Sequence, residues 1–498
     1  MPIPFTNISK QDGNTGVVPP STTGVLAIIA NAQSGTANYP GTYTRQADIL
    51  ATFGLGNLIE DAAYYLANAR KPVLLIKPTC STAAAYGTVN SSGKVGTSAV
   101  TFTGSALDEY DVVIKTPTGG TIGVAGIVLQ YSLDGGNIWS APVALGTATT
   151  LTLNVPRPST AGSSGVVANF GAGTLVTGDV VTVYSTPAYM TNSDLLTALT
   201  ALQNTKLPWD NVLIDMISTS TTIGTVDAEL SSLEGVGRGK MAWLNMRHKN
   251  KPVPSTESEA AYATAMATAL GAASTIRCDV GADGGYCASL VTGLLQFRPT
   301  SLAIATRANP QPVGIDPAWR QSGPVPGYQL SDVNGDPVWH DEYIFPGLDA
   351  LLLSTLCTDA GEPGTFIGNA RILSSPMSDW QFDQHARVSN VALEIAYKGI
   401  KVNYAKGVGT LPPDPVTGLE YILPTDATAI ESTVNPGLES ALNGQVQGVK
   451  LVLARNDDLS SNAGAVLHAD LQINALRYVK GFNVTEKFVK TIAVPLAA

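Results

Sequence analysis

The pattern of hydrophobic residues changes twice along the chain, and these changes constrain the fold more than any other feature. Residues 23–81 and 189–340 alternate buried-strand patterns with helical patterns, as in GVLAIIAN, NLIEDAAYYLANAR and PVLLIKP. This alternation is typical of a mostly parallel sheet covered by helices. Between them, residues 82–188 show short alternating runs such as AVTFTG and YDVVIKT, separated by glycine-rich turns. Such runs predict an antiparallel β-sandwich-like module.

The predicted fold class is therefore a multidomain α/β and α+β chain, since 498 residues exceed what one hydrophobic core supports. It combines an α/β core, a mixed C-terminal domain, an inserted antiparallel β-sandwich-like domain and extended terminal arms. The expected parts are an N-terminal arm at 1–22, the core at 23–81 and 189–340, the inserted outer domain at 82–188, the C-terminal domain at 341–480, and a C-terminal arm strand at 481–498.

Several helices are expected after the insertion. The stretch SDLLTALTALQNT begins at the capping-type residues Asn192 and Ser193. It is expected to share one helix face among four leucines, Leu195, Leu196, Leu199 and Leu202. Two more helical stretches are expected around residues 384–398 and 434–445.

The charge content limits the possible partners. Charged residues make up 14% of the chain and the net charge is −10, whereas soluble domains average about 25% charged residues. No dense run of Lys and Arg is present, so direct nucleic-acid contact is not expected. A surface with few charges fits a subunit packed against its own copies, although a secreted Thr- and Gly-rich β protein has the same composition.

No part of the sequence predicts membrane insertion or secretion. The longest apolar runs fall far short of a membrane span. The beginning, MPIPFTNISKQDG, lacks the basic and apolar segments of a signal peptide, so we expect the product to stay in the cytoplasm until it is released.

Catalytic, cofactor and metal motifs are not recognised. The segment EGVGRGKMA at 234–242 departs from a phosphate loop, because Glu234 replaces its first glycine and Met241 replaces its Ser or Thr. The cysteines, Cys80, Cys278, Cys287 and Cys357, form no CxxC pair. We expect reduced thiols, with a cross-link between subunits as the alternative. The chain is therefore predicted to be no enzyme, with no cofactor and no metal.

One local motif matches well. Ser132, Asp134, Gly136 and Trp139 fit the Asp-box pattern, which resembles the hairpin turn of sialidase-like propellers. In that turn Asp134 accepts backbone hydrogen bonds, glycine supplies positive φ and Trp139 packs beneath. A propeller repeats the box, whereas this chain has it once. The motif thus predicts a β-hairpin inside the insertion.

Both chain ends carry strand-like patterns. Near the C-terminus the apolar residues alternate with polar ones, at Phe482, Val484, Phe488, Ile492 and Val494. A terminal strand with one apolar face can complete a sheet in another molecule by β-augmentation, and burying five such side chains contributes roughly 8–15 kcal/mol before ordering costs. The alternative is an edge strand of the subunit's own sheet. In the N-terminal arm, Ile3 and Phe5 lie on one side of a short strand-like piece.

Three segments together resemble contractile tail sheath proteins: TGVLAIIANAQSGTANYPGTYTRQADILATFG at 23–54 with the helix and strand after it, GNARILSSPMSDWQFDQHARVSNVALEIAYKG at 368–399, and LHADLQINALRYVKGFNVTEKFVKTIAV near the end. Arg371 and Arg387 match the arginines of a sheath strand and of the helix that follows it. The Pro-Gly-Val-Tyr type of opening is missing from the N-terminal arm.

This resemblance implies a virion structural protein of a bacteriophage tail or of another contractile injection particle. Six subunits would form a ring around the tail tube protein, and rings would stack helically between baseplate and tail terminator proteins. Contraction would drive the tube through the host envelope for genome ejection, without nucleotide hydrolysis. Assembly would take place in the host cytoplasm. Two alternatives remain, a host-binding β-rich adhesin or tail decoration protein, and a glycan-processing enzyme.

Overall fold

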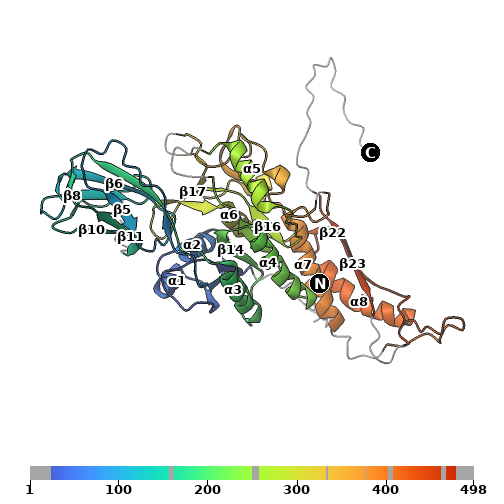
Figure 1. Cartoon of the computed structure of the whole chain (residues 1–498). Helices are drawn as coiled ribbons and strands as arrows, with labels where there is room; N and C mark the ends of the chain where they lie inside the picture. Colours follow the sequence, from blue (N-terminus) through green and yellow to red (C-terminus); the bar gives the residue numbers. More distant parts are fainter. Residues whose placement is uncertain are drawn as a thin grey trace, which may run out of the picture.

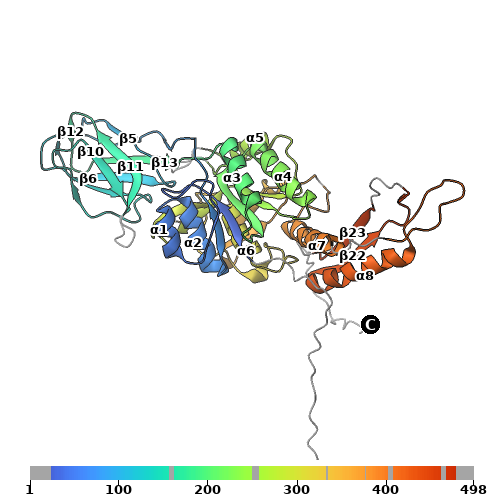
Figure 2. The same ribbon diagram turned by 90° about the horizontal axis from the view of Figure 1, so that it is seen from below.

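The computed structural model describes residues 24–155, 162–249, 257–331, 335–375, 377–401, 408–460 and 467–477. The described chain forms three parts in a row (Figures 1 and 2). The α/β core lies in the middle, the inserted β domain lies at one end, and helices α7 and α8 with strands β22 and β23 lie at the other.

A six-stranded sheet organises the core, with the strand order β16-β15-β14-β1-β3-β2. Neighbouring strands are parallel except for β2, which runs antiparallel to β3. The strands are β1 (Leu26–Ile29), β2 (Gly41–Tyr43), β3 (Val73–Ile76), β14 (Asn211–Ile217), β15 (Ala242–Asn245) and β16 (Cys278–Gly281). Both faces are covered, so β1, β3, β15 and β16 are buried along their whole length.

Helices cover the two faces of this sheet. One face packs against α1 (Gln46–Phe53), α2 (Asn57–Ala69) and α6 (Thr300–Ala308). The other face packs against α3 (Asn192–Asn204), α4 (Ser220–Gly235) and α5 (Glu259–Leu270). Alternate residues of β1 point to opposite faces of the sheet. Ile28 packs in the apolar cluster on the side of α1, α2 and α6, and Ile29 packs in the cluster on the side of α3, α4 and α5.

Helix α3 begins one residue earlier than its sequence suggested. Thr191 is the N-cap, and its hydroxyl oxygen accepts a hydrogen bond from the Asp194 backbone N–H at 3.3 Å, while the Asp194 side chain accepts from the Thr191 backbone N–H at 2.8 Å. This reciprocal pair is a capping box. The expectation that Asn192 and Ser193 provide the cap is therefore wrong.

The insertion between β3 and α3 is antiparallel β structure. Its two larger sheets have the orders β4-β13-β6-β8-β9 and β10-β11-β5, and a third pairs β12 with β7. The strands are β4 (Ala85–Tyr86), β5 (Val100–Thr103), β6 (Asp111–Thr118), β7 (Gly120–Thr121), β8 (Val128–Ser132), β9 (Val143–Ala144), β10 (Thr150–Asn154), β11 (Ser163–Phe170), β12 (Thr174–Leu175) and β13 (Val180–Thr186). Alternate residues of β6, β11 and β13 are buried, so one face of each sheet points inward.

Residues 284–331 and 335–375 pack on the core. These segments contain β17 (Gly284–Ala288), β18 (Leu295–Pro299), η2 (Arg320–Ser322), β19 (Tyr328–Gln329), η3 (Asp349–Leu351), β20 (Thr355–Asp359) and β21 (Glu362–Asn369). Leu356, Ile367 and Ile372 belong to the same buried cluster as Leu26 of β1. We therefore propose that the first part of the 341–480 segment is attached to the core.

The remaining C-terminal part is a helix pair with a β-hairpin. It contains α7 (Asp383–Lys401), α8 (Pro424–Ala441), β22 (Val446–Leu453) and β23 (Ala469–Ala475). Its own apolar cluster joins Ile395, Leu438 and Leu451. Helix α8 begins at Pro424, well before the expected start near residue 434, and Pro436 lies inside it. A proline at the first helical position suits a helix start because its missing N–H has no partner to lose there.

The predicted multidomain α/β and α+β fold class is confirmed. Among the helices that the structure describes, none combines the length and apolarity needed to cross a lipid bilayer.

Candidate functional site in the C-terminal region

Arg387 fastens helix α7 to the core. Its side chain is 1% exposed and forms an ion pair with Asp383, one turn earlier on the same helix. The guanidinium also donates to the carbonyl of Ala308, at the end of α6, at 2.9 Å, and to the carbonyl of Ile315 at 2.6 Å. Asp383 in turn accepts a hydrogen bond from the indole Nε1 of Trp243, on β15, at 2.9 Å. A buried charge is tolerated when it is paired and fully hydrogen bonded, as here.

A second buried carboxyl lies close to this pair. Burial raises the pKa of Asp383, although the neighbouring Arg387 opposes the rise. Burial and the charge of Asp383 also raise the pKa of Asp279 on β16. Asp279 accepts a hydrogen bond from the Ser354 hydroxyl at 2.5 Å. These groups form a structural network that joins the sheet to α7.

Arg371 orders the segment that leads into α7. Its guanidinium forms two hydrogen bonds with Asp349, from Nε to Oδ1 at 2.8 Å and from Nη2 to Oδ2 at 2.8 Å. The guanidinium also lies over the Phe382 ring, 4.7 Å from its centroid. The planar fork of arginine fits both contacts at once, whereas a lysine ammonium would not. Arg371 and Arg387 thus act at the two ends of the connection to α7.

The hairpin of β22 and β23 has one covered edge. Asn435 on α8 accepts a hydrogen bond from the Leu451 backbone N–H at 2.7 Å and donates to the Leu451 carbonyl at 3.2 Å. Glu431 accepts from the Leu453 backbone N–H at 2.8 Å. Helix α8 therefore occupies the edge of β22 that faces away from β23.

The outer edge of β23 is different. Leu451 is opposite Leu471, and Val449 is opposite Ile473. The backbone N–H and C=O groups of Leu451 point away from β23. In an antiparallel pair, the backbone groups of its partner Leu471 must then point away from β22. The same is true of Ile473, which lies two residues further along β23. Within residues 408–460 and 467–477, no other strand pairs with this edge. An exposed edge of this kind is a template for an added strand.

The Asp box of the insertion forms a hairpin turn. Asp134 accepts hydrogen bonds from the Ile138 backbone N–H at 2.8 Å and from the Ser132 hydroxyl at 2.7 Å. Gly136 has a φ of 101° and donates its N–H to the Ser132 hydroxyl at 2.9 Å. Lys115 lies over the Trp139 ring at 3.8 Å. The other Asp134 oxygen accepts from the Leu295 backbone N–H at 3.3 Å, so this turn also contacts the core.

The residues predicted for the two arms lie outside the described part of the chain. They are Ile3 and Phe5 in the N-terminal arm, and Phe482, Val484, Phe488, Ile492 and Val494 in the C-terminal strand. The roles of Asp383, Trp243 and Asn435 were not predicted from the sequence. Their partners lie on other elements, and no short-range pattern marks such pairs.

Residues 4–293 match the family model described as DUF2586, N-terminal domain, which is more than half of the 498 residues. The chain belongs to the DUF2586 family. No curated protein matches the sequence of this DUF2586 chain.

Solved structures share the fold of this DUF2586 chain. A chain of the anti-feeding prophage (AFP) baseplate in contracted state is 11% identical with a TM-score of 0.50, covering 98% of each chain. A chain of the 6-fold symmetrised AFP baseplate is 10% identical with a TM-score of 0.49, covering 99% of this chain and 100% of that chain. The sheath tail protein from Desulfitobacterium hafniense is 12% identical with a TM-score of 0.47, covering 95% of this chain and 100% of that chain.

The fold shared with the chain of the contracted AFP baseplate agrees with the resemblance to contractile tail sheath proteins that the sequence indicated. At such low identities the likeness is one of fold. We base the assignment of fold on the chain of the contracted AFP baseplate, which is matched over nearly its whole length.

Proposed function

We propose that this chain is a structural subunit of a contractile tail sheath and has no enzymatic activity. Subunits would form hexameric rings that stack helically around a tail tube, between a baseplate and a terminator protein. Contraction would drive the tube through the host envelope, so the protein would be located in the virion tail or an equivalent injection particle. The fold shared with a chain of the contracted AFP baseplate is the observation that carries this proposal.

The contact between subunits would be a strand added to the outer edge of β23. We propose that the C-terminal strand with Phe482, Val484 and Phe488 pairs there with the exposed backbone groups of another copy. The covered edge of β22 favours β23 as the acceptor, because Asn435 already occupies the backbone groups of Leu451. The N-terminal arm with Ile3 and Phe5 would make a second such contact.

Deleting residues 482–498 tests this function. Negative-stain electron microscopy of the full chain should show long striated tubes of uniform diameter. The truncated chain should remain soluble and fail to polymerise, because the added strand is missing. A matched variant with Asn483→Ser and Thr485→Ser, which keeps the apolar residues, should still form tubes. Normal tubes from the truncated chain would refute the role of the C-terminal strand.

A further inference from the structure

The inserted domain meets the core along a buried contact of charged side chains. We call this set the polar seam. Its members come from α2, from the β5–β6 connection of the insertion, from β14, from the segment after β15 and from β18, namely Glu60, Asp61, Asp108, Glu109, Asp215, His248 and Arg298. Glu60, Asp61, Asp108, Glu109 and Arg298 are buried. The seam therefore links residues of the insertion to the core away from water.

Arg298 joins the two parts directly. Its guanidinium binds Asp108 of the insertion through two hydrogen bonds, at 3.1 Å and 2.8 Å. The same Nη2 lies 3.6 Å from Glu60 of α2. Ser289 also donates its hydroxyl to Glu60 at 2.6 Å, from the loop between β17 and β18. One arginine thus faces one carboxylate from each side of the junction.

His248 makes the second link. Its Nε2 lies 3.3 Å from Glu109 of the insertion, and its Nδ1 lies 2.7 Å from the carbonyl of Lys249. Glu109 also accepts hydrogen bonds from the hydroxyls of Tyr184 and Tyr189, the latter at 2.9 Å. Glu109 therefore has several hydrogen-bond donors around it, and it stays negatively charged.

Among the described residues, no cationic side chain forms an ion pair with Asp61 or Asp215. Neither carboxyl oxygen of Asp61 has a hydrogen-bond partner among the described residues, although Asp61 is fully buried. Asn57 donates to Asp215 at 2.7 Å, while the amide oxygen of Asn57 has no partner in the same described part. Asn57, Asp215 and His248 line a cavity of about 20 Å³, a volume that holds about one water molecule.

The charges of the seam do not balance. Five carboxyl groups face Arg298 and His248, so even a protonated His248 leaves three negative charges uncompensated if all five ionise. Uncompensated charge is costly in a buried site, and a carboxyl group relieves it by keeping its proton. We infer that the polar seam fastens the insertion to the core only while some of its carboxyl groups hold protons, and that it loosens as the pH rises from mildly acidic to alkaline values.

The pKa shifts of individual seam residues also predict a loss of stability as the pH rises. Burial raises the pKa of Glu60 to about 7 and that of Asp215 to about 6, and burial together with Asp215 raises the pKa of Asp61. Burial lowers the pKa of His248, but Glu109 outweighs it and the result is about 9.

Raised pKa values place the loss of stability on the alkaline side. The stabilising contribution of Glu60 and Asp215 is complete below their unfolded pKa values and disappears as the pH rises through 6 to 7. The contribution of His248 disappears as the pH rises through 9. The pKa of Glu109 is lowered to about 2, so its contribution fails only in acid.

The tyrosines and the cysteine thiol around the seam leave this window unchanged, whereas burial raises the pKa of Asp283 in the same direction as those of Glu60 and Asp215. Among the described residues, other titratable side chains that face its members include Tyr110, Tyr184, Tyr189, Asp283, Cys287 and Tyr328. Burial raises the pKa of the tyrosines and of Cys287 well away from neutrality, so they stay uncharged there.

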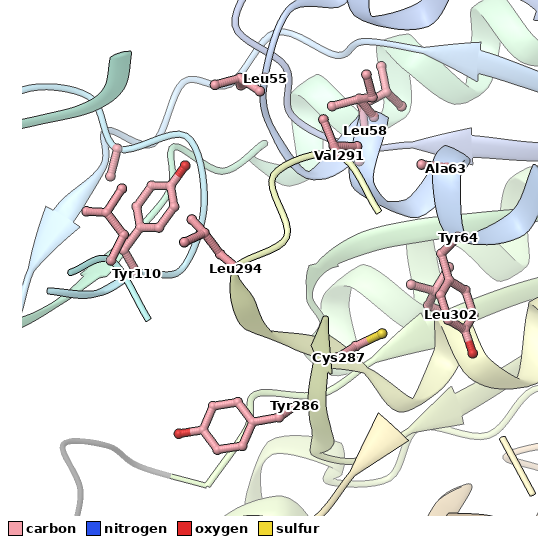
Figure 3. Close-up of a cluster of buried hydrophobic side chains, with 14 of the residues drawn as sticks. Leu55, Leu58, Ala63, Tyr64, Tyr110, Tyr286, Cys287, Val291, Leu294 and Leu302 are labelled. Carbon is pink, nitrogen blue, oxygen red and sulfur yellow. The ribbon is translucent and has the colours of Figure 1, made fainter. Parts of the chain in front are cut away.

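An apolar contact runs beside the seam and does not titrate. Figure 3 shows Leu294, on the loop between β17 and β18, directed toward Tyr110 of the insertion, and Val291 of the same loop beside Leu58 of α2. All four belong to one buried cluster. The insertion therefore stays attached when the seam loosens, and the expected change is a local opening.

Hydrogen–deuterium exchange of the full chain at about pH 6 and about pH 9, scaled for the intrinsic exchange rate, tests this inference. Protection of residues 105–111 and 289–295 should fall by about tenfold or more between the two conditions. In the variants Glu60→Gln and Asp215→Asn the fall should be smaller, since an amide cannot lose a proton and charge. Asp215 is partly exposed, so its variant carries the test if Glu60→Gln fails to fold.

Two comparisons make the result decisive. The control Asp48→Asn, at an exposed position of α1, should keep the full pH response. Residues 446–453 of β22 should show no matching loss of protection. Unchanged protection of residues 105–111 in the wild type would overturn the inference. An equal loss in β22, or a full response in both seam variants, would also overturn it.

Discussion

Asn435 on helix α8 holds the backbone of Leu451 on strand β22 through both its amide nitrogen and its amide oxygen, at 3.2 Å and 2.7 Å. A side chain here takes the place of a neighbouring strand. The hairpin consequently offers a partner its β23 edge, and the covered edge of β22 is protected against unwanted pairing.

Replacing Asn435 with Ala should destabilise the C-terminal part by about 1–3 kcal/mol, because two backbone groups of β22 lose their partners. It should also broaden the size distribution in solution, since a second edge becomes available. Thermal unfolding and light scattering measure the two effects. Glu439→Ala, at an exposed position of the same helix, should change stability by less than about 0.5 kcal/mol. Equal effects of the two variants would contradict the role of Asn435.

Replacing Arg387 with Met should lower the free energy of unfolding by about 3–5 kcal/mol, because Asp383 then stays buried without its cation. Chemical denaturation measures this loss. The matched control is Arg455→Met, which breaks an ion pair with Glu431 whose arginine is 39% exposed. That variant should lose about 1 kcal/mol or less. A small effect at Arg387 would show that its contacts do not hold α7 on the core.

Replacing Asp134 with Ala should destabilise the insertion by about 1–3 kcal/mol, because the backbone N–H groups of Ile138 and Leu295 lose their acceptor. Exchange of hydrogen for deuterium should rise in residues 132–139 and also in the loop before Leu295. Thr147→Ala, at an exposed turn position of the same domain, should leave both segments unchanged. A rise confined to residues 132–139 would show that the Asp box does not anchor the insertion.

His340 should make stability depend on pH. Burial lowers its pKa, but hydrogen bonds with Glu259 and Glu342, each at 2.8 Å, outweigh burial and the result is about 9. Its contribution is therefore complete below pH 6.5 and lost as the pH rises through 9. His340→Gln should be less stable than the wild type by about 3 kcal/mol near pH 6. Chemical denaturation of both proteins near pH 6 and above pH 9 measures this difference in stability. The difference should disappear at the higher pH. An equal difference at both pH values would contradict this account.

The sequence predicted the mixed α/β fold class that the structure shows, because periodicity is a local property. The alternation from Gly24 to Cys278 gives the parallel sheet, and the short alternating runs give the inserted β domain. The buried face of α3 was predicted less accurately. Leu196 was expected on the buried face of α3 but is 41% exposed, since Leu195, Leu199 and Leu202 already fill that face.

Contacts between distant residues could not be predicted. Arg298 and Asp108 are 190 residues apart, and Trp243 and Asp383 are 140 residues apart. Neither pair has a local spacing that reveals it. The start of α8 was also missed, because the first part of the helix, from Pro424, presents few apolar residues and Pro436 interrupts the pattern.

The most direct test of the proposed assembly is a cryo-electron microscopy reconstruction of tubes formed by the full chain. The account predicts continuous density for a strand beside β23, hydrogen bonded to Leu471 and Ile473 and connected to the C-terminus of a different copy. A β23 edge that is bare in the tube, or paired with the C-terminal residues of its own chain, would contradict the claim that this edge joins the subunits.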